Sequence, residues 1–334
     1  MLDGGWYSSS GGLSIDAYGR PNPDLSRYPS SAGGKGLAPL AAHVKSLGLK
    51  LGVWMIRGIP REAVEQNLPI YNSSYSAKDA YTLETNCSWD KSNYGMDASH
   101  PATADYYRSL HTLLDGWGVD LLKIDCFWPS ERRVKDGVTF GPELRVFGEQ
   151  FKAASARTGH DVVVSLSPGE AVSLVNSTWL DEQEFASLYR VTQDMWDVWR
   201  ANPGVSYPTD VTSKLNTARN FQGVKNASAH GAFPDLDMLP MGYMSSHGKP
   251  EGGRDMTPGC THLSDAQVRF MMTLWIISRA PLMIGATLPL RPELYDCDKT
   301  VYELVTNPEA IQVNQFAADA MEVQRETNTT HGDH

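Results

Sequence analysis

The chain repeats one arrangement along most of its length: an apolar segment that ends in polar residues, then a loop, then an amphipathic helix. The predicted strands cover 50–56, 119–125, 161–167, 187–194, 228–233 and 280–286, and residues 2–3 end another. Helical spacing of apolar residues covers 36–48, 104–118, 141–159, 211–223, 265–278 and 301–314. Strands that alternate with helices in this way predict parallel βαβ units.

The polar residues at the strand ends decide between two folds of this class. They are Asp3, Arg57, Lys123, Asp125, Ser167, Asp194, Asp235 and Asp237. In a (β/α)8 barrel these ends meet at one rim, where catalytic groups lie. We therefore predict an α/β fold, a (β/α)8 TIM barrel that lacks its first βα unit because only seven strands are found. An open doubly wound sheet is the alternative.

Composition and hydropathy argue against several classes of protein. The 334 residues carry a net charge of −10 with no long basic run, so we expect no nucleic-acid partner. The most hydrophobic stretch, 270–286, is interrupted by Arg279 and Pro281 and is too short to span a bilayer, so we expect no membrane partner. No Cys/His cluster or phosphate-binding loop accompanies the rim, so we predict neither a metal nor another cofactor.

Glycosylation sequons indicate a secretory protein. They occur at Asn72, Asn86, Asn176, Asn226 and Asn328. The expected location is therefore secreted or lysosome-like, although the chain does not open with a signal peptide. Its opening residues, MLDGGWY, read instead as the end of a strand, so we expect a fragment of a longer protein.

The predicted rim combines carboxylates with aromatic residues, which favours sugar chemistry. Glycoside hydrolysis needs one carboxylate as nucleophile or base and another as proton donor. Aromatic rings supply apolar platforms for the C–H faces of sugars. The aromatic candidates are Trp6, Trp54, Trp89, Trp128 and Trp196.

KIDC (123–126) resembles the nucleophile motif of a known family, and YRVTQDMW (189–196) resembles its acid/base segment. That family is the α-galactosidase/α-N-acetylgalactosaminidase family, glycoside hydrolase family 27 of clan D. The family's other motifs are matched by LDGGWY (2–7), FPDLDMLPMG (233–242), TLWIISRAPLMIG (273–285) and VTNPEAIQVNQ (305–315). The resemblance follows the family's order over residues 1–316.

The resemblance implies catalytic roles for two aspartates. Asp125 would be the nucleophile that forms a covalent glycosyl-enzyme, and Lys123 would keep it ionised while holding a sugar hydroxyl. Asp194 would protonate the leaving oxygen and then activate water. Such a retaining mechanism needs the two carboxyl groups about 5–5.5 Å apart.

Further residues are implied to bind the substrate, which would be a galactose-configured oligosaccharide or glycoconjugate. Arg190 and Asp237 would bind hydroxyls beside the anomeric carbon, and Asp3 would hold the axial 4-hydroxyl side of the ring. Ser167 would lie beside C2, and Trp89 would contact the sugar.

Several of these residues also have a purely structural interpretation, and Arg190 could pair with any of the carboxylates. Lys123 and Asp125 could form an ordinary ion pair. Asp194 could cap the helix that follows it. Asp237, with Asp235, could order its loop, and Trp89 could pack in the core. Their joint placement on successive strand ends favours the catalytic interpretation.

Substrate and activity stay open among related choices. A terminal α-D-galactoside is the first expectation, with α-N-acetylgalactosaminide and β-L-arabinopyranoside as alternatives. The family often has two adjacent Asp where this chain has Asp3 and Gly4, and a Glu where it has Ser167. A catalytically inactive galactose-binding relative is the alternative from a different class. The oligomeric state is not predicted.

The resemblance also bears on cysteine pairing and on the chain's ends. Cys87 lies in the long loop after the strand at 50–56 and Cys126 adjoins the expected nucleophile, so a disulfide would hold that loop over the pocket; two free thiols are the alternative. For Cys260 and Cys297 only the even count favours pairing. We expect residues 1–316 to form the barrel, with 317–334 a polar tail or linker to a missing C-terminal β-domain.

Overall fold

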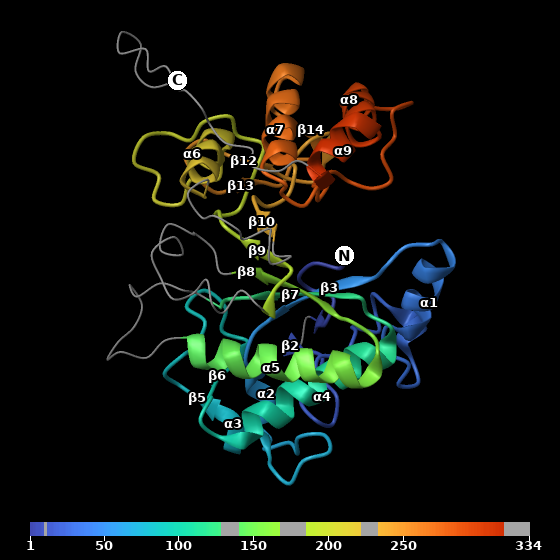
Figure 1. Ribbon diagram of the computed structural model, residues 1–334, viewed down its shortest axis with the longest axis vertical. Coiled ribbons are helices and arrows are strands. Elements are labelled where there is room, and N and C mark those ends of the chain that lie inside the picture. Colours follow the sequence, from blue (N-terminus) through green and yellow to red (C-terminus); the bar gives the residue numbers. More distant parts are fainter. Residues whose placement is uncertain (10–11, 128–139, 168–184, 222–232, 317–334) are drawn as a thin grey trace. The chain divides into compact units, whose positions relative to one another are not determined.

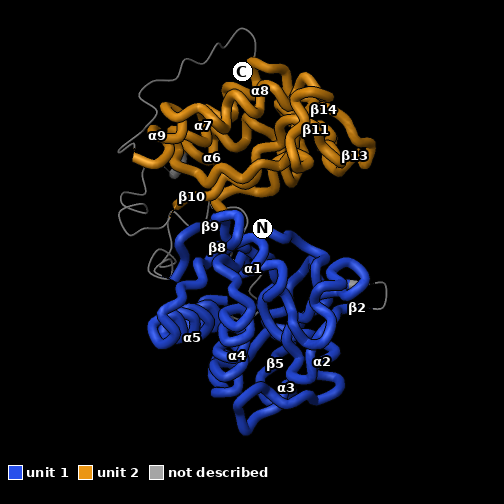
Figure 2. The backbone as a smooth tube through the Cα atoms, turned by 90° about the vertical axis from the view of Figure 1, so that its right-hand side faces the viewer, with its two compact units in different colours: residues 1–168, 177–189 blue, residues 169–176, 190–334 orange. Residues whose placement is uncertain are grey.

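The computed structural model describes residues 1–9, 12–127, 140–167, 185–221 and 233–316, and the predicted tail at 317–334 lies outside them (Figure 1). The chain divides into two compact units (Figure 2). Unit 1 comprises Met1–Pro168 and Ser177–Tyr189, and unit 2 comprises Gly169–Asn176 and Arg190–His334.

Unit 1 is built on a parallel sheet. Its strands β3 (Gly52–Ile56), β7 (Leu121–Asp125) and β8 (Val163–Ser167) lie side by side, and β9 (Leu188–Arg190) pairs with β8. Leu2 adds a parallel bridge to Val53, as expected for a strand end. The register aligns Ile56, Asp125 and Ser167, so the carboxyl ends of three strands share one edge. The predicted parallel strands are therefore confirmed here.

The crossovers of unit 1 are helical. Helix α4 (Pro101–Trp117) joins the β3 side of the sheet to β7, and α5 (Gly141–Thr158) precedes β8; the two helices pack together (Figure 1). Each ends at a glycine with positive φ, Gly118 and Gly159, which stops the helix. Helix α1 (Ala38–Ser46) packs against α4 before β3 begins.

A small antiparallel sheet replaces the long loop predicted after β3. It contains β4 (Ile59–Pro60), β6 (Asn93–Met96) and β5 (Tyr81–Thr82), in that order. Short helices α2 (Arg61–Glu65) and α3 (Ala77–Ala80) lie between β4 and β5, and the turn between β5 and β6 carries Cys87. A two-stranded ribbon, β1 (Ser8–Ser9) with β2 (Gly12–Leu13), completes the short strands of the unit.

In unit 2, β10 (Phe233–Asp235) pairs with the end of β9, within what we expected to be a loop. Residues 228–232 of the predicted strand lie outside the described residues. The main helices are α6 (Val211–Phe221) and α7 (Asp265–Ile277). The helix predicted at 301–314 is two helices, α8 (Asp296–Val305) and α9 (Pro308–Phe316), because proline begins a helix but does not continue one. The predicted strand at 280–286 forms only a parallel bridge between Ile284 and Leu239.

Two short ribbons fill the segment between β10 and α7. Strand β11 (Tyr243–Met244) pairs with β14 (Gly259–Cys260), and β12 (His247–Gly248) pairs with β13 (Arg254–Asp255). A disulfide from Cys260 to Cys297 fastens β14 to α8. Among the helices that the structure describes, none combines the length and apolarity needed to cross a membrane.

Candidate active site

Asp125, the predicted nucleophile, ends β7 and has its carboxylate held by two neutral N–H donors. The indole Nε1 of Trp54 donates to Oδ2 at 3.1 Å, and the backbone N–H of Cys126 donates to Oδ1 at 2.7 Å. Hydrogen bonds to the charged form of a carboxylate favour that form. These two donors therefore hold the side chain in one orientation.

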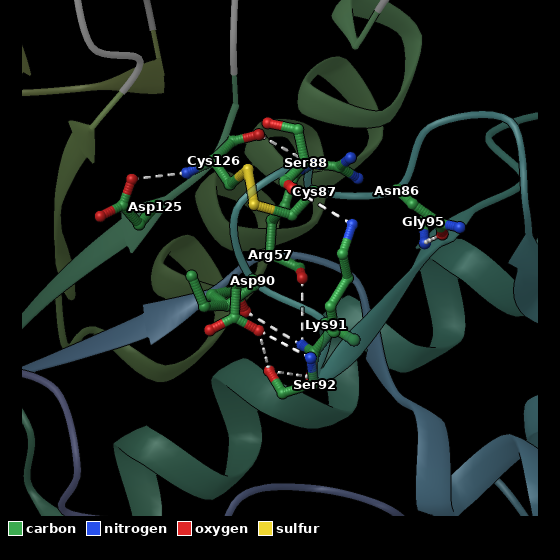
Figure 3. The surroundings of a disulfide bond; sticks show 12 residues. Arg57, Asn86, Cys87, Ser88, Asp90, Lys91, Ser92, Gly95, Asp125 and Cys126 are labelled. Atoms are coloured by element: carbon green, nitrogen blue, oxygen red, sulfur yellow. Dashed lines mark hydrogen bonds between the residues drawn. A yellow bond between two sulfur atoms is a disulfide. The ribbon is translucent and has the colours of Figure 1, made fainter. Parts of the chain in front are cut away.

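The residue after Asp125 is fixed by three separate constraints. Cys126 has φ 71°, is bonded to Cys87 by a disulfide with Cα atoms 5.9 Å apart, and accepts a hydrogen bond on its carbonyl from Arg57 Nε at 2.9 Å (Figure 3). The predicted pairing of Cys87 with Cys126 is thus present. Because the N–H of Cys126 contacts Asp125, these constraints also position the carboxylate.

Arg57, predicted at the rim, is instead buried in the core of unit 1. Its Nη1 lies 2.5 Å from Glu143 Oε2 on α5, and Tyr107 OH donates to Glu143 Oε1 at 2.6 Å. Burial, followed by the charge of Glu143, raises the pKa of Tyr107, so its hydroxyl stays a donor. The buried carboxylate of Glu143 holds the Arg57 guanidinium in the core, although Nη2 has no hydrogen-bond partner in the part of the chain that the structure describes.

Sequence reasoning missed Glu143. It stands four and eight residues before Phe147 and Phe151, which are buried, and therefore lies on the inward face of α5. This helical spacing was the sign in the sequence that the Glu143 side chain would be buried. An acidic residue on an apolar helix face needs a buried cation, and Arg57 is that cation.

Lys123 and Asp3 lie near one another beside this edge of the sheet. Lys123 Nζ is 3.8 Å from Asp3 Oδ2, and the two side chains are 10% and 63% exposed. Because the two charged groups are far apart for an ion pair and the Asp3 side chain is largely exposed to solvent, this ion pair is weak. The Asp3 carboxylate therefore remains largely accessible, as a hydroxyl-binding residue would need to be.

Two residues of the N-terminal segment contact Trp54. Trp6 Nε1 donates to the Trp54 carbonyl at 2.7 Å, and the Tyr7 ring stacks on the Trp54 ring at 6.4 Å between centroids. The ring also covers Gly4, since a Cβ placed there would lie 3.5 Å from it. The position where the family often carries a second Asp is thus faced by an aromatic ring.

The remaining predicted residues of unit 1 lie in different environments. Ser167 is buried at the end of β8, level with Asp125 in the sheet register. Trp89 is 51% exposed, so the alternative that it packs in the core is wrong. Trp128 lies outside the described residues.

In unit 2, Arg190 forms the centre of a second cluster. From the end of β9 its Nη1 donates to Asp237 Oδ1 at 2.8 Å, and its Nη2 donates to Asp194 Oδ1 at 3.3 Å. Burial alone would lower the pKa of Arg190, but the surrounding carboxylates, Asp237 first, raise it. The predicted Arg190, Asp194 and Asp237 are therefore brought together.

Asp194, the predicted acid/base, keeps an accessible carboxyl group. Its side chain is 44% exposed, and Oδ2 lies 3.8 Å from Arg254 Nη2. The interpretation of Asp194 as a helix cap is wrong, because α6 begins at Val211 and the carboxylate of Asp210 accepts from Ser213 N at 3.0 Å.

Asp237 and Asp235 differ in role. Asp235 is buried and accepts the backbone N–H of Asp237 at 2.7 Å, so it does order the loop. Asp237 has φ 80°, and its Oδ2 accepts the N–H of Met195 at 2.6 Å while Oδ1 pairs with Arg190. That pairing fixes the backbone next to Asp194.

Lys214 and Tyr207 also support Asp194, and sequence reasoning missed both. The buried Lys214 ammonium donates to the carbonyls of Asp194 at 3.0 Å and Pro208 at 3.1 Å. Burial, and then the charge of Arg190, lowers the pKa of Lys214 to about 8. The only sign in the sequence that Lys214 would be buried was its position three residues after the apolar Val211, which is buried.

Tyr207 contacts the backbone of Asp194. Its hydroxyl accepts the N–H of Asp194 at 3.3 Å, and burial, followed by the charge of Asp194, raises the pKa of Tyr207 to about 12.

One group in unit 2 has the residue types of a metal site. Asp197, His247 and His262 place their ligand atoms within 4.8 Å of one another. The Asp197 carboxylate, however, already accepts from His247 Nδ1 at 2.5 Å, Gly248 N at 2.9 Å and His262 N at 2.8 Å. These hydrogen bonds form a cluster around the buried Asp197 carboxylate, and the cluster joins the segment after β9 to the β12 ribbon.

A solved structure that is similar to this chain is that of a GH27 β-L-arabinopyranosidase from Geobacillus stearothermophilus. It is 32% identical, with a TM-score of 0.81 over 97% of this chain and 69% of that one. The chain belongs to glycoside hydrolase family 27. The predicted α/β fold of (β/α)8 barrel type is thereby confirmed.

More distant family members span several activities. Alpha-galactosidase 3 of Hypocrea jecorina is 24% identical over 95% of this chain and 45% of that protein. The human alpha-N-acetylgalactosaminidase is 24% identical over 90% of this chain and 54% of that protein. The chain thus spans about half the length of the curated relatives it matches. No family model matches the chain.

Proposed function

We propose that the protein is a retaining exo-glycosidase that removes terminal galactose-configured sugars by a double displacement. The observation that carries the proposal is the Asp125 carboxylate, held by Trp54 and Cys126 at the end of β7 in a family 27 chain. A nucleophile must be aimed at the anomeric carbon, and hydrogen-bond donors at fixed positions support that aim.

In the first step, an Asp125 oxygen attacks the anomeric carbon while the bond from that carbon to the leaving oxygen breaks. Asp194, in its protonated form, transfers its proton to the leaving oxygen. The products are a glycosyl ester on Asp125 and the free leaving alcohol.

In the second step, the Asp194 carboxylate takes a proton from water. The water oxygen attacks the anomeric carbon and the ester bond to Asp125 breaks, which restores both carboxyl groups to their starting states. Two inversions retain the anomeric configuration.

Substrate hydroxyls would be bound from both clusters. Asp3, with its accessible carboxylate, and the ammonium of Lys123 offer an acceptor and a donor. The Arg190–Asp237 pair offers a second donor and acceptor. The exposed ring of Trp89 offers an apolar face.

α-D-Galactosides are the first proposed substrates, because several of the curated relatives are named as alpha-galactosidases. A second candidate is β-L-arabinopyranosides, which match α-galactosides except for the absent hydroxymethyl group. The specific observation is Gly4 covered by Trp54, which supplies no polar side chain at that position, together with 32% identity to the bacterial arabinopyranosidase. α-N-Acetylgalactosaminides are a third, given the small Ser167.

Secretion and glycosylation remain part of the proposal. Asn72 is exposed with φ 52°, so its amide can carry a glycan, whereas the Asn86 amide oxygen accepts from Gly95 N at 3.0 Å. The disulfides of Cys87 with Cys126 and of Cys260 with Cys297 agree with an oxidising compartment.

The test is a release assay with the nitrophenyl α-D-galactoside, α-N-acetylgalactosaminide and β-L-arabinopyranoside. Cleavage of at least one, with retained anomeric configuration by NMR, supports the proposal. Binding of galactose without cleavage of any of the three would instead support an inactive sugar-binding relative. An inverted product would exclude the two-step mechanism.

A further inference from the structure

The β12–β13 ribbon of unit 2 brings a cation to the predicted acid/base, although the ribbon has no part in the two proposed steps (Figure 1). Arg254, the first residue of β13, places Nη2 3.8 Å from Asp194 Oδ2. The other carboxylate oxygen, Oδ1, lies 3.3 Å from Arg190 Nη2. Each oxygen of the Asp194 carboxylate therefore faces a different guanidinium group.

The Arg254 side chain is held in place by an aromatic ring. Its guanidinium carbon lies 4.5 Å from the centre of the Trp196 ring, a cation–π contact. Trp196 follows Asp194 by two positions, and its N–H donates to the Thr209 carbonyl at 2.8 Å. The ring that carries Arg254 is thus fixed to the same short segment as the acid/base, so the arginine and the carboxylate share one support.

Strand β12 packs closely on that segment. A Cβ at Gly248 would lie 2.4 Å from Trp196 Cβ and 3.0 Å from Val198 Cγ2, so a larger residue could not occupy this position without a shift. The Asp197 carboxylate accepts the N–H of Gly248 at 2.9 Å and contacts His247 Nδ1 at 2.5 Å. The buried Asp197 cluster therefore fixes the ribbon against residues 196–198.

The chain that leaves β13 is anchored as well. The N–H of His262 donates to Asp197 Oδ2 at 2.8 Å, and the disulfide from Cys260 to Cys297 fastens β14 to α8. Both sides of Arg254 in the sequence are thus tied to fixed parts of unit 2. An exposed arginine on an anchored ribbon can hold a direction that a free surface arginine does not.

The direction of the Asp194 carboxyl group affects its proposed task, because a general acid must deliver its proton to the leaving oxygen. We infer that the β12–β13 ribbon orients the acid/base, with Arg254 as the positioning residue that sets the direction of the Asp194 carboxyl group; this inference rests on the proposed function. The two side chains are 56% and 44% exposed, so the pair adds little to stability. Its effect is on the orientation of Asp194.

The experiment uses aryl glycosides of the terminal sugar that the release assay selects, since aryl leaving groups differ in their need for a proton and offer no hydroxyl to bind. Arg254→Met should lower kcat/KM about fivefold for the phenyl glycoside, which needs the proton. For the dinitrophenyl glycoside, which does not, the loss should stay within about 1.5-fold. Arg254→Lys, which keeps the charge, should recover part of the loss. Arg269→Met removes a similarly exposed ion pair with Glu303, and this control should change neither rate.

A second variant moves the ribbon without removing the arginine. Gly248→Ala places a methyl group against Trp196 and should give the same pattern, a larger loss of kcat/KM for the phenyl than for the dinitrophenyl glycoside. Gly116→Ala, where a Cβ would meet no atom within 4 Å, is its control and should change neither rate. Thermal melts check that each variant is folded. Equal losses on both substrates, or no loss, in either Arg254→Met or Gly248→Ala would overturn the positioning role while hydrolysis itself stands.

Failure of the proposed function would be seen separately, as a wild-type protein that cleaves no aryl glycoside. Crystal structures of the wild type, Arg254→Met and Arg269→Met then decide the positioning role. A changed direction of the Asp194 carboxyl group in Arg254→Met, but not in Arg269→Met, supports it. The same direction in all three would overturn it.

Discussion

The two predicted catalytic aspartates are held in opposite ways. Asp125 receives uncharged N–H donors on both carboxylate oxygens, and its neighbour Cys126 is fixed by a disulfide and by Arg57. Asp194 is nearly half exposed, and its carboxylate approaches two arginines at 3.3 and 3.8 Å. Its backbone, rather than its carboxylate, is what Lys214 and Tyr207 hold.

The difference matches the two proposed tasks. A nucleophile performs one covalent step at one atom and gains from rigid placement. An acid/base must exchange protons with a leaving group and then with water, so its carboxyl group must stay accessible. If the comparison is right, substitutions at the two sites should differ in kind as well as in size.

The largest expected effect is that of Asp125→Asn. Removing the attacking oxygen should lower kcat by about 10⁴-fold or more for every substrate, whatever its leaving group. Kinetics on the nitrophenyl glycosides measure this, and circular dichroism checks the fold. Activity within tenfold of wild type would remove Asp125 from the nucleophile role.

Asp194→Ala should show a smaller effect that depends on the leaving group. We expect a loss of about 10²–10⁴-fold for a disaccharide, whose leaving oxygen needs the proton, and much less for a nitrophenyl glycoside. Azide should restore turnover by attacking the glycosyl-enzyme, giving a glycosyl azide detectable by mass spectrometry. Equal losses on both substrates with no azide product would contradict the assignment.

Arg57→Met tests the support beneath Asp125. It leaves Glu143 buried without its cation, so unfolding free energy should fall by about 3–5 kcal/mol. Arg108→Met, which removes a more exposed ion pair with Asp105, is the control and should cost less than about 1 kcal/mol. Urea unfolding followed by tryptophan fluorescence measures both. Similar costs for the two variants would show that the Arg57–Glu143 pair does not support the fold.

The smallest expected effect is a pH dependence of stability from Lys214. Its pKa is about 8 in the fold and 10.5 for an ordinary lysine, so between these values the unfolded chain binds more protons. The Lys214 contribution to unfolding free energy should therefore rise with pH across this window, by about 1.4 kcal/mol for each unit, up to roughly 3 kcal/mol.

Urea unfolding at pH 7.5 and pH 10 measures this change. Lys214→Met should lose it, whereas Lys35→Met, at an exposed position in unit 1, should keep it. The same pH response in wild type and Lys214→Met would contradict the assignment of the shift to Lys214.

Features that repeat along the sequence could be predicted from it. Contacts made by single buried charged residues could be predicted much less well. Alternating apolar segments located β3, β7 and β8, and polar residues at their ends located Asp125 and the Arg190 cluster. Arg57 was misplaced at the rim because its partner, Glu143, is 86 residues away. Charged residues on helices are usually solvated, so Lys214 gave almost no signal.

The most direct test of the central claim is to trap the glycosyl-enzyme. The protein would be incubated with the 2-deoxy-2-fluoro glycosyl fluoride of its preferred terminal sugar, and peptides would be mapped by tandem mass spectrometry. The account predicts one glycosyl adduct on the Asp125 carboxyl group, absent from Asp125→Asn. An adduct on another residue, from protein that is active and folded, would contradict it.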